Sequence, residues 1–579
     1  MDHADYRAQR EEVPTTESWR EAMLAGPGET PARERVHLSR PRRIMMAALM
    51  SLVGLTFLIP GMTIGYWDRD EAEYAEVAHT MARTGDFLVP RLFGDLYPDK
   101  PPFSEWISAI SYRWFGESEV SGRLPHVLFS AGACALLFLL GERLYGRRAG
   151  IFSALSYATS LLFLIYGRLF NTDSDLVFFT LGTMICVFPI LQNEGRWRWA
   201  TFGGLALGLA FLTKGPLAAI APACLVIGYV AGKGRVSRAS WQRLAALALI
   251  GTVVGSTWFI LSAIATRGES LKVFLLRDNV YRFFHPMEGH HGPILYYVGV
   301  LVLGLFPWSG FLPSLLHKNA WRRDPVRWAL FGWGFGLLGF FSMAATKLPH
   351  YLLPALPAFS LLIFGPRFVQ KERERQVFAW VSLGVGTLLV LSIILAACAL
   401  NLPGYAGGVM VPFIAVGVLS CALPLVSIRR STRVIATVFA LIVAGCIAAL
   451  TPSELDPARL LPRFGKHTAV FRRVGEPVGG LKIDEPALGY YARLDRMGRW
   501  DSANQVVEAA RLSPTASVLV WLESADGVAL ARKHEARVQV LESGFNLIDP
   551  TAYGKIEIAR LSIRPPLKSE GSLPNPQPQ

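Results

Sequence analysis

Residues 44–76 read IMMAALMSLVGLTFLIPGMTIGYWDRDEAEYAE, an apolar run followed at once by a dense acidic cluster. The run is long enough to cross a bilayer as one helix, because a spanning helix needs roughly 17–25 mostly apolar residues. The acidic cluster is not expected inside the hydrocarbon region, where charged side chains are costly. The stretch therefore predicts a membrane span that ends where the acids begin.

The composition of the whole chain also indicates a membrane protein. Of its 579 residues, 52% are apolar and 18% are charged, whereas an average soluble domain carries about 25% charged residues. The net charge of +14 is better explained by basic loops on one membrane face than by nucleic-acid binding. The six cysteines lie in apolar runs without the spacing of a metal site, so we interpret them as buried apolar residues.

The pattern of apolar runs predicts a polytopic α-helical membrane protein with about thirteen spanning helices. Every second connection between these runs is rich in Lys and Arg, which places those loops and the N-terminus in the cytoplasm. The candidate spans are residues 44–66, 121–143, 150–167, 173–192, 199–213, 216–232, 244–266, 293–316, 327–345, 350–365, 377–400, 409–428 and 433–451.

The rest of the chain divides into four parts around these spans. Residues 1–43 are expected to be a disordered basic cytoplasmic tail, and residues 567–579 a second disordered tail. The membrane domain of 44–451 includes a long outer loop, 67–120, predicted to form amphipathic helices at the membrane surface. Residues 452–566 alternate helix-like and strand-like segments, which predicts a small periplasmic α/β domain.

Charged residues gather at the outer ends of the predicted spans, although they come from loops far apart in the sequence. Such charges are expensive at a membrane boundary and mark pathways or sites. Several have plain alternatives: Lys214 and Lys347 as anchors that reach toward water, Asp173 as a helix cap, and His290 with His291 as a loop feature. The set comprises Asp70, Glu71, Glu73, Asp99, Lys100, Asp173, Lys214, Arg282, His290, His291, Lys347 and His350.

Bases at the lipid boundary suit a phosphate that an amphiphile presents there, and a neighbouring carboxylate suits a general base or an orienting group. A sugar linked to a polyprenyl phosphate has the right parts, with its tail in lipid and its phosphate on the bases. A divalent metal on Asp70, Asp99 or His291 is an open alternative that no ligand spacing demands, and no other cofactor is expected.

At these residues the chain resembles the C-type-fold membrane glycosyltransferases that include the lipid A aminoarabinose transferases and the protein mannosyltransferases. The resemblance covers about residues 60–365. It is carried by DRDEAEYAEVAHTMARTGDFLVPRLFG, LYPDKPPF, RLFNTDSDLVFF, LAFLTKGP and TKLPHYLLPALPA. It implies an inverting transfer from an undecaprenyl-phosphate sugar to a periplasmic acceptor.

The resemblance also implies roles for individual residues. Asp70, with Glu71 beside it, matches the acidic motif of the first outer loop, and Asp173 matches the acid before the fourth span. A second group matches residues expected at the donor phosphate, namely Lys100, Lys214, Tyr351 and, less closely, Arg282. We add Lys347 to this group because it lies at the outer end of a predicted span. The chain departs from the aminoarabinose enzymes at Glu73, where they tend to carry Arg, and at Asp99, where they carry Glu.

These observations favour a monomeric inner-membrane glycosyltransferase with a periplasmic active site. Its donor would be a polyprenyl-phosphate sugar, its acceptor lipid A or another envelope lipid or glycan, and it would have no nucleic-acid partner. The alternatives are a protein O-mannosyltransferase-like enzyme, a flippase for lipid-linked sugars, and a non-catalytic scaffold. A flippase would need polar residues at both faces, whereas here they gather at the outer face.

Within the acidic cluster, helical spacing assigns different directions to neighbouring acids. If residues 70–81 are helical, Asp70 and Glu73 share one face, whereas Glu71 and Glu76 point away from it. We therefore expect Asp70 to face the site, with Glu73 next to it as part of the substrate pocket together with Asp99, His290 and His350. Glu76 is expected to face water or backbone.

Overall fold

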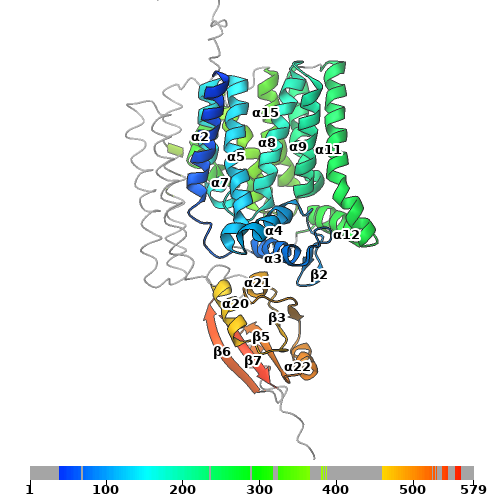
Figure 1. The fold of residues 1–579 in the computed structure, drawn as a ribbon. Coiled ribbons are helices and arrows are strands. Elements are labelled where there is room, and N and C mark those ends of the chain that lie inside the picture. The colour runs from blue at the N-terminus through cyan, green and yellow to red at the C-terminus, as the bar shows by residue number, and fades with distance from the viewer. Residues whose placement is uncertain are drawn as a thin grey trace, which may run out of the picture.

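The computed structural model describes residues 38–66, 69–233, 236–286, 290–316, 324–365 and 460–523, together with short pieces at 380–381, 384, 387, 526–527, 530, 537–545 and 555–562. Within these residues an upright bundle of helices stands on a layer of short helices, and an α/β unit follows below (Figure 1). Among the described residues, six helices are long and apolar enough to cross a membrane. The predicted spans 377–400, 409–428 and 433–451 lie outside the described residues, so the total of about thirteen stays a prediction.

The bundle helices follow the predicted apolar runs closely at most positions. Two predicted spans are broken by residues outside any helix: 150–167 divides into α6 and α7, and 293–316 divides into α14 and the 3₁₀ segment η3. Two others, 216–232 and 350–365, begin as the 3₁₀ segments η1 and η5 and continue without a gap as α10 and α16. The elements are α2 (Arg40–Leu58), α5 (Glu119–Tyr145), α6 (Arg147–Ala158), α7 (Leu161–Tyr166), α8 (Thr172–Leu191), α9 (Trp197–Lys214), η1 (Gly215–Ala219), α10 (Ile220–Lys233), α11 (Arg238–Ala265), α14 (Tyr296–Gly304), η3 (Trp308–Leu316), α15 (Pro325–Met343), η5 (Pro349–Ala355) and α16 (Leu356–Phe364).

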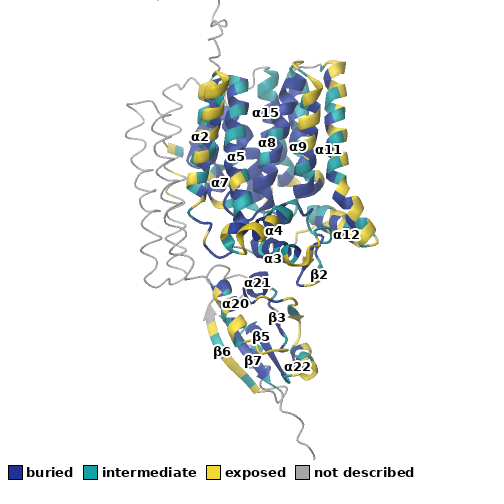
Figure 2. Cartoon of the chain, in the orientation of Figure 1, coloured by how far each residue is buried: buried dark blue, intermediate teal, exposed yellow. Residues whose placement is uncertain are grey.

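Close approach of α9 and α11 depends on glycines at their contact. A Cβ on Gly204 would lie 2.7 Å from the Cβ of Ile250, and one on Gly208 would lie 2.5 Å from the Cβ of Val254. Small residues let helix backbones approach in membranes, where packing rather than burial from water drives association. Figure 2 shows the result, with buried residues between the helices and exposed ones on the outer faces.

The outer loop forms the layer beneath the bundle. It contains α3 (Arg69–Thr84), a short hairpin of β1 (Arg91–Leu92) and β2 (Asp95–Leu96), and α4 (Phe103–Phe115). The two helices agree with the helices predicted for this loop, whose position at the membrane surface stays a prediction, and the hairpin was not predicted. A second group of short helices joins α11 to α14: α12 (Glu269–Lys272), the π-helix η2 (Val273–Tyr281) and α13 (Arg282–Phe284).

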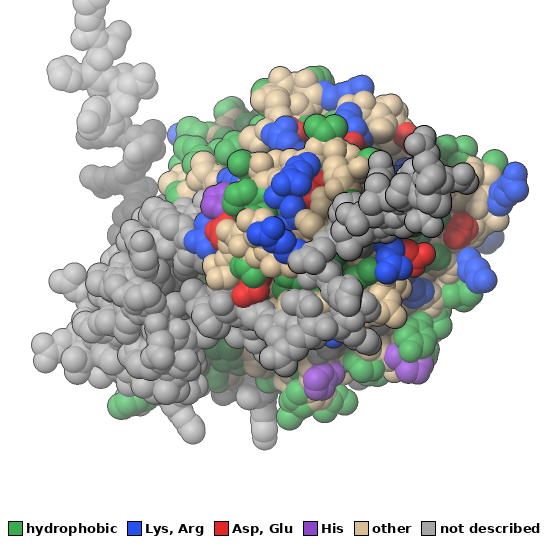
Figure 3. Space-filling model, turned by 90° about the horizontal axis from the view of Figure 1, so that it is seen from below, with side chains coloured by type: hydrophobic (Ala, Val, Ile, Leu, Met, Phe, Trp, Pro, Cys, Tyr) green, Lys and Arg blue, Asp and Glu red, His purple; other side chains and the backbone are tan. Residues whose placement is uncertain are grey.

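The C-terminal unit is a five-stranded mixed sheet in the order β4-β3-β5-β7-β6. β3 pairs in parallel with β4 and β5, whereas β7 pairs antiparallel with β5 and β6. Viewed from below, its surface carries scattered Lys and Arg side chains (Figure 3). The elements are α20 (Leu460–Phe471), β3 (Val478–Leu481), α21 (Pro486–Tyr491), β4 (Gly498–Trp500), α22 (Ala503–Leu512), β5 (Ser517–Glu523), β6 (Arg537–Phe545) and β7 (Lys555–Ser562).

The α/β unit and the loop helices share one hydrophobic core rather than touching only at their surfaces. Buried residues of α3 and α4, including Tyr74 and Ala109, belong to the same cluster as Leu488 of α21 and Trp521 of β5. Polar contacts reinforce it: the backbone N–H of Tyr66 donates to the hydroxyl of Tyr491 at 2.8 Å. The helix that carries Asp70 is therefore held from both sides, by the bundle and by the C-terminal unit.

Candidate functional site

A pocket opens where the loop helices meet the ends of the bundle helices. Charged side chains form one part of its wall: Asp99 and Lys100 from the outer loop, Lys214 from the end of α9, and Asp278 with Arg282 from the η2 region. Aromatic and apolar side chains form the other part, namely Leu217, Phe274, Phe283, Phe340, Phe341, Ala344 and Tyr351. A pocket with this division suits an amphiphile that carries an anionic group.

Asp70 is tied to the pocket through Lys100. The Lys100 Nζ lies 3.5 Å from a carboxylate oxygen of Asp70 and 4.3 Å from the centre of the Tyr74 ring. The hydroxyl of Tyr74 donates to the same carboxylate at 3.2 Å. Burial acts to raise the pKa of Asp70, but the charges of Lys100, His350 and Arg282 outweigh it and lower the pKa to about 2. Asp70 is thus a stable anion at the site.

The second acid of the site, Asp173, lies on the bundle side. Lys214 Nζ donates to its carboxylate at 2.5 Å, and His350 Nε2 lies 3.7 Å from the other carboxylate oxygen. Lys214 also lies over the ring of Tyr351, 4.5 Å from its centre. The structure therefore brings Asp173, Lys214, His350 and Tyr351 together, as the sequence predicted, from three connections far apart in the chain.

Local sequence explains why these side chains are available. Asn171 accepts from the backbone N–H of Asp173 at 2.6 Å and so caps α8, which leaves the Asp173 carboxylate to Lys214. The alternative in which Asp173 is the cap is therefore wrong. Lys214 ends α9 because Gly215 follows with a φ of +67°, a conformation that favours glycine.

Glu71 is placed elsewhere, in a second ion pair behind α3. Its two carboxylate oxygens accept from Arg123 at 2.6 and 2.7 Å, and one also accepts from the backbone N–H of Phe170 at 2.8 Å. Arg123 in turn donates to backbone carbonyls at Gly61, Met62, Ile64 and Gly65. Glu71 does not line the pocket, so its position favours a structural role, and the predicted catalytic role stays a prediction.

Lys347 is likewise placed outside the pocket wall. Its ammonium donates to the carbonyls of Phe341, Ser342 and Ala344 at 3.0, 2.6 and 2.5 Å, at the C-terminal end of α15. An ammonium has three N–H groups, and all three are used. This geometry favours a helix-capping role for Lys347, and its predicted contact with the donor phosphate stays a prediction.

Glu73 and Glu76 are both buried, although only Glu73 lies beside Asp70. Glu73 accepts from the hydroxyl of Tyr97 at 2.6 Å and from Arg69 at 2.9 Å. Burial, and then the charge of Asp70, raise the pKa of Glu73 to about 7. Glu76 is 3% exposed and accepts from Thr80 at 3.2 Å. The expectation that Glu76 faces water or backbone is wrong, because its carboxylate is buried and bonded to the Thr80 side chain.

The remaining predicted residues divide between the pocket and the surface. Asp99 and Asp278 lie on either side of Arg277, at 3.5 and 3.2 Å, and burial followed by the charge of Asp99 raises the pKa of Asp278 to about 7. His290 and His291 are exposed and do not line the pocket. Within the part of the chain that the structure describes, no group of three or more His, Cys, Asp and Glu side chains could hold a metal ion.

A buried polar network next to the site was not predicted. Asp175 accepts from Ser104 at 2.6 Å and lies 2.9 Å from His126 Nδ1, while His126 Nε2 lies 2.9 Å from Ser108. These four side chains are fully buried and join α4, α5 and α8. Asp175 stands two positions after Asp173, and Ser104 four after Lys100, so the network fixes the two halves of the site relative to each other. The sequence signal that could have revealed this network is the presence of Asp175 and His126 within apolar runs.

Comparison with known proteins identifies the relatives of this chain. Residues 99–260 match the family model of dolichyl-phosphate-mannose-protein mannosyltransferases. The undecaprenyl phosphate-alpha-4-amino-4-deoxy-L-arabinose arabinosyl transferase of Yersinia enterocolitica is 32% identical over 55% of this chain and 58% of its own. That of Pseudomonas paraeruginosa is 30% identical over 62% and 66%. Over these regions the chain is similar to these transferases.

The solved structures support the fold. The ArnT protein of Cupriavidus metallidurans bound to undecaprenyl phosphate superposes with a TM-score of 0.72, covering 90% of this chain and 98% of its own at 19% sequence identity. The predicted resemblance and the C-type membrane fold are confirmed. The matched region spans 58 to 66% of the length of the two curated relatives.

Proposed function

We propose that the protein transfers a sugar from a polyprenyl phosphate to an anionic acceptor in the pocket between the loop helices and the bundle. The observation that carries this proposal is the pocket wall, in which Lys100, Lys214 and Arg282 face aromatic and apolar side chains. The names of the relatives support 4-amino-4-deoxy-L-arabinose on undecaprenyl phosphate as the donor, and lipid A as the acceptor. The bases would hold the donor phosphate, and the apolar wall would hold the first part of the lipid.

The chemistry follows from the charges around this position. An acceptor oxygen attacks the anomeric carbon of the sugar, and the bond from that carbon to the donor phosphate breaks, with its electron pair leaving on the phosphate. The anomeric configuration is inverted in this single displacement. Lys100 and Arg282 stabilise the charge that develops on the departing phosphate. No proton needs to move if the acceptor is already ionised.

Asp70 distinguishes between two kinds of acceptor. An efficient general base has a pKa near the working pH, whereas the pKa of Asp70 is about 2. Asp70 is therefore suited to holding Lys100 and orienting the substrates, and poorly suited to removing a proton from a hydroxyl. This favours a phosphate of a glycolipid over the Ser or Thr hydroxyl of a protein, which is the acceptor suggested by the mannosyltransferase family model.

A transfer assay separates these possibilities. Purified protein is mixed with radiolabelled undecaprenyl-phosphate sugar and with lipid A, dephosphorylated lipid A or a Ser/Thr-rich peptide. We expect label on lipid A and none on the other two acceptors. Label on the peptide or on dephosphorylated lipid A would overturn the proposal for an anionic acceptor, and the absence of transfer from every donor would overturn the proposed activity.

We also propose that the pocket faces the periplasm of a bacterial inner membrane, with the N-terminus in the cytoplasm and the C-terminal unit outside. The basic connections between spans support this orientation. A reporter active only in the periplasm should work when fused after residue 460 and fail when fused at residue 240. The reverse pattern would invert the orientation.

A further inference from the structure

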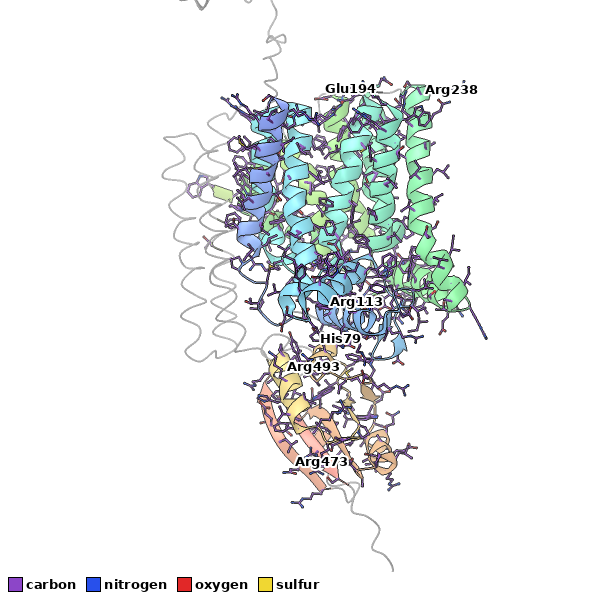
Figure 4. The ribbon with its side chains drawn as sticks, viewed as in Figure 1. His79, Arg113, Glu194, Arg238, Arg473 and Arg493 are labelled. Atoms are coloured by element: carbon purple, nitrogen blue, oxygen red, sulfur yellow. The ribbon has the colours of Figure 1, made fainter. Side chains whose placement is uncertain are left out.

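A second pocket lies at the opposite end of the bundle from Asp70. It has a volume of about 410 Å³ and is formed where α2 and α6 begin. In Figure 4 this end of α2 lies at the top, level with the labelled Glu194 and Arg238, whereas the layer that contains α3 lies below. The pocket is lined by Leu38, Arg42, Met45, Met46, Arg147, Arg148, Ile151 and Phe152.

The three arginines of this pocket differ from other arginines at the same end. Arg43 forms an ion pair with Glu142 at 3.1 Å, and Arg143 forms one with Glu194. Arg42, Arg147 and Arg148 are exposed, and within the described ranges no carboxylate is paired with any of them. Three arginines therefore border one apolar cavity, and no carboxylate among the described residues neutralises them.

The surroundings of the pocket are those of a membrane boundary. On α2, Ile44, Met45 and Leu49 have exposed fractions of 61, 64 and 45%, so this helix presents an apolar strip directly beside the arginines. An apolar strip of this kind is suited to an acyl chain. Arg42, Arg147 and Arg148 lie in the first turns of α2 and α6, at the level where lipid headgroups are expected.

We propose that this pocket binds an anionic phospholipid of the leaflet opposite the candidate active site. The phosphate would lie among Arg42, Arg147 and Arg148, whose planar forks match phosphate oxygens, and one acyl chain would follow the apolar strip of α2. Basic pockets between membrane helices select anionic over zwitterionic headgroups. The site is separate from the donor pocket, and it does not depend on the transfer reaction.

Native mass spectrometry of the full-length protein tests the proposal. Delipidated protein is titrated with phosphatidylglycerol or phosphatidylcholine, and bound lipid is counted. We expect one phosphatidylglycerol to be retained in preference to phosphatidylcholine, and Arg147→Gln/Arg148→Gln to weaken phosphatidylglycerol binding by about thirtyfold. The matched control is Arg196→Gln/Arg198→Gln, which removes the same charge from exposed positions at the start of α9. Equal binding of both lipids, or an equal loss in the control, would overturn the site.

The acidic residues of the chain's own segment 1–37 make that segment the competing occupant. A photo-crosslinking p-benzoylphenylalanine at Met45, which is exposed in the pocket, distinguishes the two. A crosslink to phospholipid in vesicles that contain phosphatidylglycerol supports the lipid site. A crosslink to a peptide from residues 1–37 would overturn it.

Discussion

Two ion pairs start from neighbouring residues of α3, yet their environments are opposite. The Asp70–Lys100 pair is loose, at 3.5 Å, and its side chains are 34 and 17% exposed. The Glu71–Arg123 pair is bidentate, at 2.6 and 2.7 Å, and its side chains are 1 and 0% exposed. A loose pair beside a pocket can exchange partners with a substrate, whereas a buried bidentate pair cannot. Chemistry is therefore expected at Asp70 and structural support at Glu71.

The largest effect is expected for Asp70→Asn. This change keeps the volume of the side chain but removes the charge that holds Lys100, so transfer should fall by about 10²–10³-fold while the unfolding temperature stays close to that of the wild type. The measurement is transfer of radiolabelled sugar together with thermal unfolding of the same preparation. Unchanged transfer would remove Asp70 from the reaction.

Glu71→Gln should act on stability instead. It leaves the Arg123 guanidinium buried without its anion, and breaking a buried pair in this way costs about 3–5 kcal/mol. We expect a large fall in unfolding temperature and in the yield of folded protein, measured by intrinsic fluorescence. A stable Glu71→Gln protein without transfer activity would show that the two acids had been assigned the wrong way round.

A smaller loss of transfer activity is expected for Asp175→Asn. This variant sharpens the comparison of Asp70 with Glu71, because Asp175 is buried like Glu71 but lies close to the site. Removing its charge weakens the bonds from His126 and Ser104, at a cost of about 1.5–3 kcal/mol. If Asp175 positions the two halves of the site, kcat should fall while the pH profile of transfer keeps its shape. A shifted pH profile would instead indicate a direct part in the reaction.

Glu76→Gln should have the smallest effect on activity. It should also stabilise the protein at high pH, whereas Glu71→Gln should destabilise it. Burial raises the pKa of Glu76 to about 8, against the nearby groups His79 and Thr80, which lower it. Between pH 4.5 and 8 the folded protein keeps a proton that the unfolded chain has lost, so stability falls as pH rises through this window.

The substitution removes that pH dependence. Its unfolding temperature should exceed the wild-type value at pH 8 and match it near pH 4.5. The charged groups near Glu76 are His79, Arg83 and Glu117. A His79→Gln control reports how much of the pH dependence of stability comes from His79. A lower unfolding temperature for Glu76→Gln at pH 8 would contradict the assignment.

Much of the bundle was predictable because a spanning helix is a local property of the sequence. The predicted runs 121–143 and 173–192 correspond to α5 (Glu119–Tyr145) and α8 (Thr172–Leu191). The interruptions between α6 and α7 and between α14 and η3 were missed, since both lie in continuous apolar stretches. Hydropathy records burial in lipid or protein, and it is insensitive to a local break in the helix.

The sequence predicted which residues gather at the site, but not the role of each of them. The pocket wall was found because charges at helix ends are rare, and Lys100, Lys214 and Arg282 stood out for that reason. The role of Glu71 depends on Arg123, which lies 52 residues away, and that of Lys347 depends on how α15 ends. Partner choice is a tertiary property, so spacing alone could not separate Asp70 from Glu71.

The most direct test of the central claim is equilibrium binding of undecaprenyl phosphate, without sugar or acceptor, to Lys100→Ala and Lys347→Ala. Lys100 lines the pocket, whereas the ammonium of Lys347 is used by three backbone carbonyls. The account predicts that Lys100→Ala binds about 10–100-fold more weakly, because a charge-assisted bond to phosphate is lost, and that folded Lys347→Ala binds like the wild type. Wild-type affinity in Lys100→Ala, with loss of binding in Lys347→Ala, would contradict it.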